Sequence, residues 1–598
     1  MMAREHDLVR KQYKTRYMPG LDGLRAIAVV AVIIYHLNPQ ILSGGFLGVD
    51  TFFVISGFLI TSLLLHEYSE TGRIDLKNFW IRRFKRLIPA VVFLLMVLVS
   101  YMALFHLERL MAIKSDVFAA LVYMSNWWFI IKDVSYFEAL EAHPLKHLWS
   151  LAIEEQFYII WPLVLLAMLV FVKRMNRIWL ITFILSLVSL IVMIVLSAPF
   201  SDNSRVYFGT DTRAHSLLIG VMLAYIFPPF RLKAQIDRAS SVVLNSAGII
   251  SLGILIYMFT FVSASHYWIY AGGLYLIAAL TTVLIAASVH PTTFFATKLL
   301  GNPLFVWIGK RSYSLYLWHY PIIVLSNTYF IQGQVPIYMI IIQIVLTLVM
   351  AEISYRFIEQ PFRREGFKAL GFKRVVGRVR FVLVAGLGVV LALFISGVLD
   401  GPIDDVLETR NQEQLSENMR FTSSIKTIDQ SIVNQQSIRS LEPLFIGDSI
   451  TVDIEEEVLA RMPNATVDGN IGRQLWDVQS LVEENYTDFV DGDDIVVLQL
   501  GTNGTIAEND MEALVDLFGD ATVYLINTRS PRDWQNDVNA LLMSVSENNE
   551  NVHLIDWHGT SAGHPEYFST DGVHLTPLGK QVIVQEIVDV IDEYSLVD

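Results

Sequence analysis

Residues 82–105 read RRFKRLIPAVVFLLMVLVSYMALF, a basic cluster followed directly by a long apolar run. A helix of about twenty mostly apolar residues is long enough to cross the roughly 30 Å hydrocarbon core of a membrane. Lysine and arginine gather on the cytoplasmic side of such helices. The stretch therefore predicts a membrane-spanning helix that leaves the cytoplasm near residue 88 and ends near residue 106.

Apolar runs of this kind recur through the first 400 residues. We expect eleven spans, near residues 23–38, 46–66, 88–106, 149–172, 178–199, 214–229, 242–263, 267–289, 312–331, 336–358 and 380–399. With this count, every basic cluster between the spans falls on one side, which the positive-inside rule assigns to the cytoplasm. The sequence thus predicts a multi-pass plasma-membrane protein with a cytoplasmic N-terminus and an extracellular C-terminal part, residues 401–598.

Charge and composition divide the chain at the same place. Of the 598 residues, 53% are hydrophobic and 17% are charged, whereas about a quarter is usual in soluble proteins. Residues 401–598 carry 9 Lys+Arg against 37 Asp+Glu, a net charge of −28, and the net −14 of the whole chain leaves +14 for the rest. So acidic a tail argues against a nucleic-acid ligand. The absence of cysteine excludes disulfides and thiolate chemistry, and we expect no bound metal or cofactor.

The first expected span carries two ionisable residues, Arg25 and His36. Ionisable side chains are rare inside membranes and often functional. About three helical turns separate them, so they share one helix face roughly 16 Å apart. Histidine is suited to general-base catalysis near neutral pH. The spacing alone leaves two readings open: an acyl-transfer pair, or an arginine that reaches the headgroups and a histidine packed in the core.

Two further spans carry candidate residues. Arg83 and Arg86 lie on one helical face at the cytoplasmic end of the third span, where they could bind the phosphates of an anionic donor or simply follow the positive-inside rule. Glu154, in HLWSLAIEEQFYIIWPL, lies just inside the fourth span. A carboxylate at that depth suggests an internal ion pair or part of a reaction path.

Seven motifs occur in order along this half. They read LDGLRAIAVVAVIIYH, GVDTFFVISGFLIT, RRFKRLIPA, HLWSLAIEEQFYIIWP, GTDTRAHSLLIG, SYSLYLWHYPII and YRFIEQPFRR. Together they resemble the membrane-bound acyltransferase-3 family across about residues 17–365. The resemblance implies transfer of an acyl group, usually acetyl, across the membrane from cytoplasmic acetyl-CoA as donor substrate. It also implies roles for Arg25 and His36 in acyl transfer, for Arg83 and Arg86 in donor binding, and for Glu154 as the acidic position.

From residue 443 the tail alternates strand-like and helical stretches, which predicts an α/β/α domain with a parallel sheet. Polar residues follow the strands at the edge where such sheets hold active sites. Ser449 begins a helix in FIGDSIT, Gly472 follows the second strand and Asn503 the third. Asp571 and His574, in DGVHL, come before the last helix. Serine, histidine and aspartate form a nucleophilic triad, and Ser449, Gly472 and Asn503 offer N–H donors for an oxyanion hole.

These residues resemble the SGNH (GDSL-type) hydrolase family across about residues 443–595, with Ser449, Gly472, Asn503 and His574 at its four named positions. One departure is Gly504, which stands where the family commonly has aspartate. The asparagine before it is retained, so the departure bears on substrate preference more than on chemistry. The resemblance implies a covalent acyl-serine intermediate.

The expected organisation is a cytoplasmic basic tail (1–16), a ten-span acyltransferase domain (17–365), a basic linker with the eleventh span (366–400), a connector (401–442) and the catalytic domain (443–598). This arrangement resembles bacterial peptidoglycan O-acetyltransferases. It implies acetylation of a cell-surface glycan, the 6-hydroxyl of N-acetylmuramic acid first among the acceptors, with lysozyme resistance as the consequence. Two alternatives stay open: acetylation of another surface polysaccharide, and an extracellular acetylesterase. A passive transporter would explain the spans but not the triad.

Overall fold

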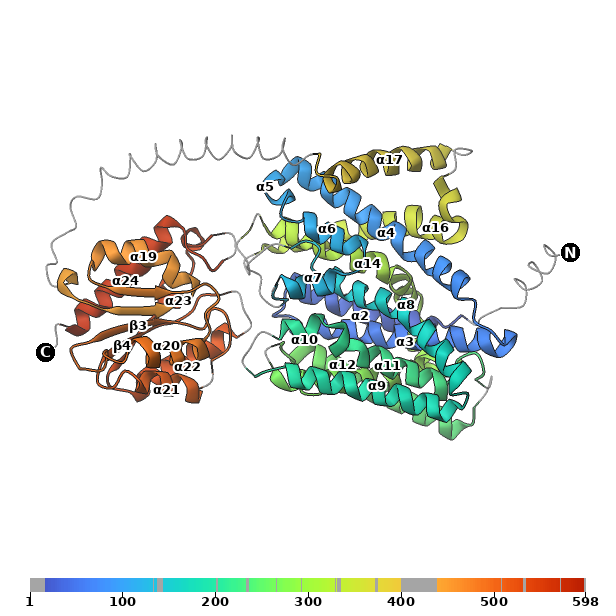
Figure 1. Cartoon of the computed structure of the whole chain (residues 1–598), viewed down its shortest axis with the longest axis horizontal. Helices are drawn as coiled ribbons and strands as arrows, with labels where there is room; N and C mark the ends of the chain where they lie inside the picture. Colours follow the sequence, from blue (N-terminus) through green and yellow to red (C-terminus); the bar gives the residue numbers. More distant parts are fainter. Residues whose placement is uncertain are drawn as a thin grey trace.

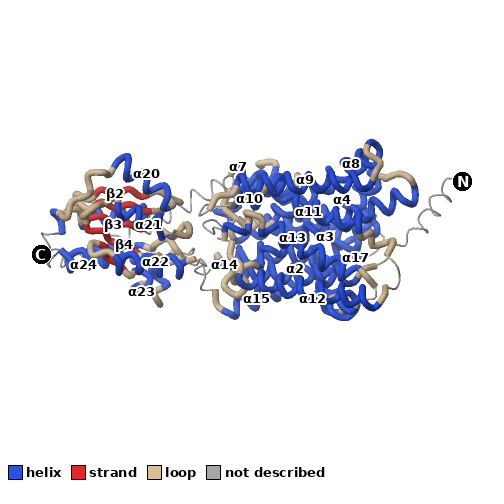
Figure 2. Tube along the Cα trace, turned by 90° about the horizontal axis from the view of Figure 1, so that it is seen from below, coloured by secondary structure: helices blue, strands red, loops and turns tan. Residues whose placement is uncertain are grey.

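The structure, a computed structural model, describes residues 17–132, 134–136, 143–199, 203–232, 236–264, 266–291, 293–328, 330, 335–370, 375–398, 438–506, 508–530, 534–569 and 572–595. Within these ranges, the part before residue 399 consists of helices and loops, and strands occur only after residue 443 (Figures 1 and 2). The predicted N-terminal tail and most of the predicted connector lie outside the described residues, as does Asp571.

Eleven long helices lie in the described residues of the first part. They are α2 (Pro19–Leu37), α3 (Gly48–Thr71), α4 (Leu76–Phe105), α8 (Leu148–Phe171), α9 (Met175–Leu196), α11 (Thr210–Ile226), α12 (Arg238–Phe261), α13 (Gly273–Val289), α14 (Pro303–Asn327), α15 (Ile337–Ile353) and α17 (Val375–Ile395). Short helices lie between them: α5 (Leu107–Leu110), α6 (Lys114–Leu121), α7 (Ser125–Ile131), α10 (Ser204–Phe208) and α16 (Gln360–Glu365). Each predicted span falls on one of the long helices.

Length and composition alone qualify seven helical segments of the described part to cross a membrane, namely α2, residues Gly45–Thr71, α4, α8, α9, α12 and residues Ile337–Glu365. The segments Gly273–Val289 and Ala385–Ile395 are apolar but shorter. The remaining two predicted spans fall on α11 and α14. The protein is therefore a membrane protein, whereas the count of eleven spans stays a prediction.

Helix α9 displays the polarity expected of a helix that faces lipid. After its first turn, which carries the exposed Asn176 and Arg177, its exposed side chains are apolar, with Ile184 and Val188 each 50% exposed. Its buried side chains include the hydroxyls of Thr182 and Ser186. A helix on the surface of a soluble protein has the opposite arrangement, with apolar residues inside and polar residues outside. The outer face of α9 is thus suited to hydrocarbon, and its hydroxyls point into the bundle.

Helices α3 and α11 approach each other closely because each has glycine at the crossing. A Cβ on Gly57 would collide with the backbone of Leu217, and one on Gly220 with the backbone of Val54. Small residues allow close helix packing in membranes, where water exclusion does not drive helices together. This crossing brings the polar residues of the two helices into contact.

The second part is a five-stranded parallel sheet in the order β2-β1-β3-β4-β5. Its strands are β1 (Leu444–Gly447), β2 (Thr466–Gly469), β3 (Ile495–Gln499), β4 (Thr522–Ile526) and β5 (Val552–Ile555). Its helices are α19 (Ser449–Arg461), α20 (Leu475–Asn485), α21 (Glu508–Asp516), α22 (Gln535–Asn548), α23 (Trp557–Thr560) and α24 (Pro577–Ser595). The predicted parallel sheet is confirmed.

Helices cover both faces of this sheet (Figure 1). Helices α19 and α24 pack on one face with Phe445, Val497 and Tyr524 of the strands. Helices α20, α21 and α22 pack on the other face with alternate residues such as Ile446 and Leu498. Because strands β1, β3 and β4 are buried on both faces, nearly all their residues are apolar, which explains the continuous apolar runs in the sequence. In this order β2 lies on one side of β1 and β3 on the other, so the direction in which strands are added reverses at β1. At such a switch point, ligands bind at the carboxyl ends of the strands.

Candidate functional site

Ser449 lies at this switch point, as the first residue of α19 directly after β1. Its neighbour Asp448 caps the helix, accepting a hydrogen bond from the Ile450 N–H at 3.0 Å. The Asp448 N–H donates to the Gln499 carbonyl at 3.2 Å, which ties the turn to β3. The serine hydroxyl therefore sits at the positive end of a helix, on a turn fixed from both sides.

The other two predicted oxyanion donors follow the two strands that flank β1. Asn503 follows β3, and its Nδ2 and the Ser449 Oγ are both buried without a hydrogen-bond partner among the described residues. Gly472 follows β2 with a φ of 79°, a conformation that favours glycine. Buried polar groups are normally paired in native proteins, so two unpaired groups at one site call for a functional explanation.

His574 lies in the turn that leads into α24. The Asp453 Oδ2, on α19, accepts a hydrogen bond from the N–H of the next residue, Leu575, at 3.0 Å. This bond ties the histidine turn to the helix that begins with Ser449. Asp571, the third member of the predicted triad, lies outside the described residues.

Asp448 is an additional acidic group at this site. Its carboxylate is fully buried, and one oxygen has no hydrogen-bond partner among the described residues. Burial raises the pKa of Asp448 to about 6, opposed by hydrogen bonds from Ile450 and Thr502 and by the charge of His574. The carboxylate is thus close enough to His574 for their charges to interact.

In the helical part, four of the predicted residues line one cavity of about 70 Å³. Arg25 of α2, Arg83 and Arg86 of α4, and Glu154 of α8 all line it, so three different helices contribute to the cavity. Glu154 accepts hydrogen bonds from Ser56 at 2.8 Å and from the Tyr158 hydroxyl at 3.3 Å. The cavity therefore combines three cations with a fixed carboxylate, an arrangement suited to an anionic or polarised ligand.

His36 does not line this cavity. Its Nδ1 lies 3.0 Å from His319 Nε2, and its Nε2 lies 3.3 Å from the Tyr136 hydroxyl. The ring of His147 packs against those of His319 and Tyr320, at 5.8 Å and 5.0 Å between centroids. The structure thus separates Arg25 and His36, which share one helix face, into two polar sites.

A buried ion pair joins the crossing helices α3 and α11. Arg213 donates to Asp50 at 2.8 Å, both side chains are fully buried, and Ser216 donates to the same carboxylate at 3.0 Å. The Arg213 guanidinium also lies over the ring of Tyr207, 4.5 Å from its centroid. Removing one partner of a buried pair leaves an uncompensated charge, so the loss of either side chain would destabilise this helix crossing.

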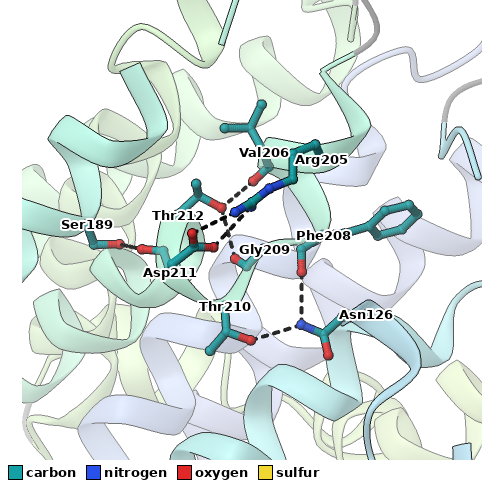
Figure 3. Close-up of polar contacts among 9 residues, drawn as sticks. All are labelled: Asn126, Ser189, Arg205, Val206, Phe208, Gly209, Thr210, Asp211 and Thr212. Atoms are coloured by element: carbon teal, nitrogen blue, oxygen red, sulfur yellow. Dashed lines mark hydrogen bonds and ion pairs between the residues drawn. The ribbon is translucent and has the colours of Figure 1, made fainter. Parts of the chain in front are cut away.

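The turn before α11 is fixed by the polar residues of the GTDTR motif (Figure 3). Asp211 pairs with Arg205 of α10 at 2.8 Å, and Thr212 donates to the carbonyls of Val206 and Gly209. Asn126 of α7 donates to the Phe208 carbonyl and to Thr210. These bonds set where α11 begins and hence where Arg213 enters the bundle.

Sequence reasoning missed several of these residues. Asp50, Arg213 and His319 stand in motifs that signalled the family, so a signal was present, but periodicity does not show which helices touch. Tyr136 lies in a loop with no motif, and only the structure places it beside His36. Among the described residues, no group of three or more His, Cys, Asp or Glu side chains could hold a metal ion.

Comparison with known proteins identifies the family. Residues 18–355 match the acyltransferase-3 family, described as an acyltransferase domain. The O-acetyltransferase OatA of Staphylococcus aureus strain MRSA252 is 47% identical over 602 residues, covering 100% of this chain and 99% of the relative.

Two solved structures resemble the C-terminal part. The C-terminal catalytic domain of Streptococcus pneumoniae peptidoglycan O-acetyltransferase A matches at 16% identity and a TM-score of 0.23, covering 26% of this chain and 93% of that one. A lipase/acylhydrolase from Enterococcus faecalis matches at 20% identity and a TM-score of 0.22, covering 26% and 97%. The family resemblance predicted from the motifs is confirmed by the full-length match. The chain belongs to the membrane-bound acyltransferase-3 family, as an O-acetyltransferase related to S. aureus OatA over its whole length.

Proposed function

We propose that the protein takes acetyl from cytoplasmic acetyl-CoA, passes it through the membrane half to Ser449 outside the cell, and transfers it to a hydroxyl of peptidoglycan, the 6-hydroxyl of N-acetylmuramic acid. The observation that carries the proposal is the pair of buried, unpaired groups, Ser449 Oγ and Asn503 Nδ2. A nucleophile and an oxyanion donor are the groups that stay unpaired until substrate arrives. The choice of peptidoglycan is supported by the name OatA, which the full-length relative shares with an enzyme described as acting on that polymer.

The chemistry at Ser449 divides into two steps that balance. In the first, the hydroxyl attacks the acetyl carbonyl and His574 takes its proton. The tetrahedral oxyanion is held by Ser449 N–H, Gly472 N–H and Asn503 Nδ2. The leaving group departs with the proton from His574. In the second, a glycan hydroxyl attacks the acetyl-serine while His574 takes its proton, and His574 returns that proton to the Ser449 Oγ as the serine ester bond breaks. Asp571 is assigned to orient the imidazole.

The arginine-lined cavity is the proposed donor site. We assign it the thioester end of acetyl-CoA, with the phosphates toward its arginines. Arg83 and Arg86 are placed to attract a polyanion, because charge-assisted bonds from guanidinium to phosphate are strong. Arg25 and Glu154 would then face the acetyl group. His36 lies beyond this cavity and is assigned to the onward transfer.

The test compares the purified protein with its Ser449→Ala variant, using an activated acetyl ester as donor and a muropeptide as acceptor. The expected result is an acetyl adduct on the peptide that contains Ser449, mapped by mass, and acetylated muropeptide as product. An adduct on another residue would refute the assignment of Ser449. Release of acetate with no acetylated glycan would favour the acetylesterase, and acetylation of a different surface polysaccharide in cells would change the acceptor.

A further inference from the structure

Gly504 departs from the pattern of the SGNH family, and the structure supplies a spatial reason. Glycines with positive φ include Gly472 and Gly501 but not Gly504, so its backbone does not require glycine. A Cβ on Gly504 would instead lie 2.5 Å from the Gln474 Oε1, closer than non-bonded atoms approach. The missing side chain therefore makes room for that of Gln474.

Gln474 uses this space to join two loops. Its Nε2 donates to the Asn503 carbonyl at 3.1 Å and reaches the Gly472 carbonyl at 3.5 Å. Its own backbone N–H donates to Asp477 Oδ2 at 3.0 Å, which fixes it at the start of α20. The side chain is thus anchored at one end and bonded to both loops at the other.

These two loops have no direct link through the sheet. Gly472 follows β2 and Asn503 follows β3, and β1 lies between those strands. Backbone hydrogen bonds between neighbouring strands therefore do not fix the position of one loop relative to the other. An oxyanion hole works only when its donors converge on the position of the oxyanion, within a few tenths of an ångström.

We propose that Gln474 is a positioning residue that holds the Gly472 and Asn503 donors together over Ser449, and that residue 504 is glycine in order to admit it. This inference rests on the proposed function of the Ser449 site. Gln474 does not touch the reacting atoms. It acts through the two carbonyls, whose residues carry the donors.

The test measures the rate of Ser449 acetylation by 4-nitrophenyl acetate with the full-length protein in detergent. Gln474→Ala should lower kcat by roughly tenfold, less than the roughly 10²–10³-fold cost of deleting an oxyanion donor outright, with KM within about twofold. Gln474→Glu should do the same, because its carboxylate lacks the N–H. Gln479→Ala is the matched control, since Gln479 lies on the same helix and donates to the Asp510 carbonyl instead; its activity should be unchanged.

Gly504→Ala tests the same contact from the other side. The group in its way is the end of a flexible side chain, so the protein should fold normally with Gln474 displaced and kcat lowered to a similar degree. The double variant should then be no slower than Gln474→Ala alone, since the two changes break one contact. If Gln474→Ala fails to accumulate, the kcat of Gly504→Ala tests the inference by itself.

Wild-type kcat in Gln474→Ala, or losses that multiply in the double variant, would overturn the inference. The Ser449→Ala variant distinguishes a failure of this inference from a failure of the proposed function. An inactive Ser449→Ala with a normal Gln474→Ala refutes the positioning role only, whereas an active Ser449→Ala refutes the catalytic serine itself.

Discussion

His36 Nδ1 and His319 Nε2 lie 3.0 Å apart, so imidazoles from α2 and α14 share one hydrogen bond. The direction of this bond follows from its neighbours. His319 Nδ1 lies 2.7 Å from the Tyr316 carbonyl, which can only accept, so this nitrogen carries the proton. With both rings neutral, His36 Nδ1 then donates to His319, and His36 Nε2 is left as an acceptor facing the Tyr136 hydroxyl. The ring of His36 is therefore oriented with its acceptor nitrogen toward Tyr136, as the proposed role of His36 as a base requires.

Replacing His36 by alanine should abolish acetylation of the cell wall, because the base is removed, while the protein still inserts at normal levels. The Ser449 site of the same variant should keep its activity on an activated ester, since that donor bypasses the membrane step. Wall acetylation is measured by mass spectrometry of muropeptides. Normal acetylation in this variant would make His36 a packing residue. If His36→Ala fails to accumulate, His36→Gln keeps most of the volume and separates folding from chemistry.

The ion pair between Asp50 and Arg213 should be a stability element of the helical part. Arg213→Ala leaves a buried carboxylate without its cation and should cost about 3–5 kcal/mol, seen as early unfolding in detergent. Asp50→Asn together with Arg213→Gln should recover much of that loss, because neither charge is then left without its partner.

Arg205→Ala is the matched control, since the pair that Arg205 forms with Asp211 is about a third exposed on each side. It should cost less than about 1 kcal/mol. Equal losses in Arg205→Ala and Arg213→Ala would contradict this account.

The sequence predicted elements better than contacts. The strands and the placement of Ser449, Gly472 and Asn503 at their ends follow from runs of apolar residues and from the geometry of parallel sheets. The long helices follow from hydrophobicity, although α4 and α14 begin well before the predicted spans because polar residues at a membrane surface do not end a helix. Arg25 and His36 were placed correctly on one face of a helix. That they belong to different sites depends on which helices pack beside each turn, and periodicity does not encode this.

Asp448 should make the stability of the C-terminal domain depend on pH. Its pKa in the folded protein is about 6, above the roughly 3.9 of an unperturbed aspartate. The folded state therefore favours the protonated form, so the contribution of Asp448 to stability is fully present below about pH 4 and is lost as the pH rises to about 6 and beyond. The loss is on the order of 3 kcal/mol.

Asp448→Asn should remove this loss, because asparagine also caps helices and stays neutral. Thermal unfolding of residues 435–598, expressed alone, should show the variant more stable than the wild type at pH 7.5 and equal to it near pH 4. A constant difference at both values would mean that Asp448 does not titrate in this range.

The orientation of the chain can be tested at α17. With eleven spans the C-terminus is extracellular, and α17 is the helix that carries the chain across after Glu365. Alkaline phosphatase, which folds only outside the cytoplasm, should be active when fused after Asp598 and inactive when fused after Glu365. Green fluorescent protein, which does not fluoresce after export through the general secretion pathway, should give the opposite result at both positions. The comparison isolates one helix, because the two fusions share all preceding spans.

If both positions report the cytoplasm, α17 does not cross the membrane and Ser449 is on the wrong side to meet a cell-wall glycan. If both report the outside, a span has been miscounted before residue 365, and the arginine-lined cavity would have to receive its donor from another direction.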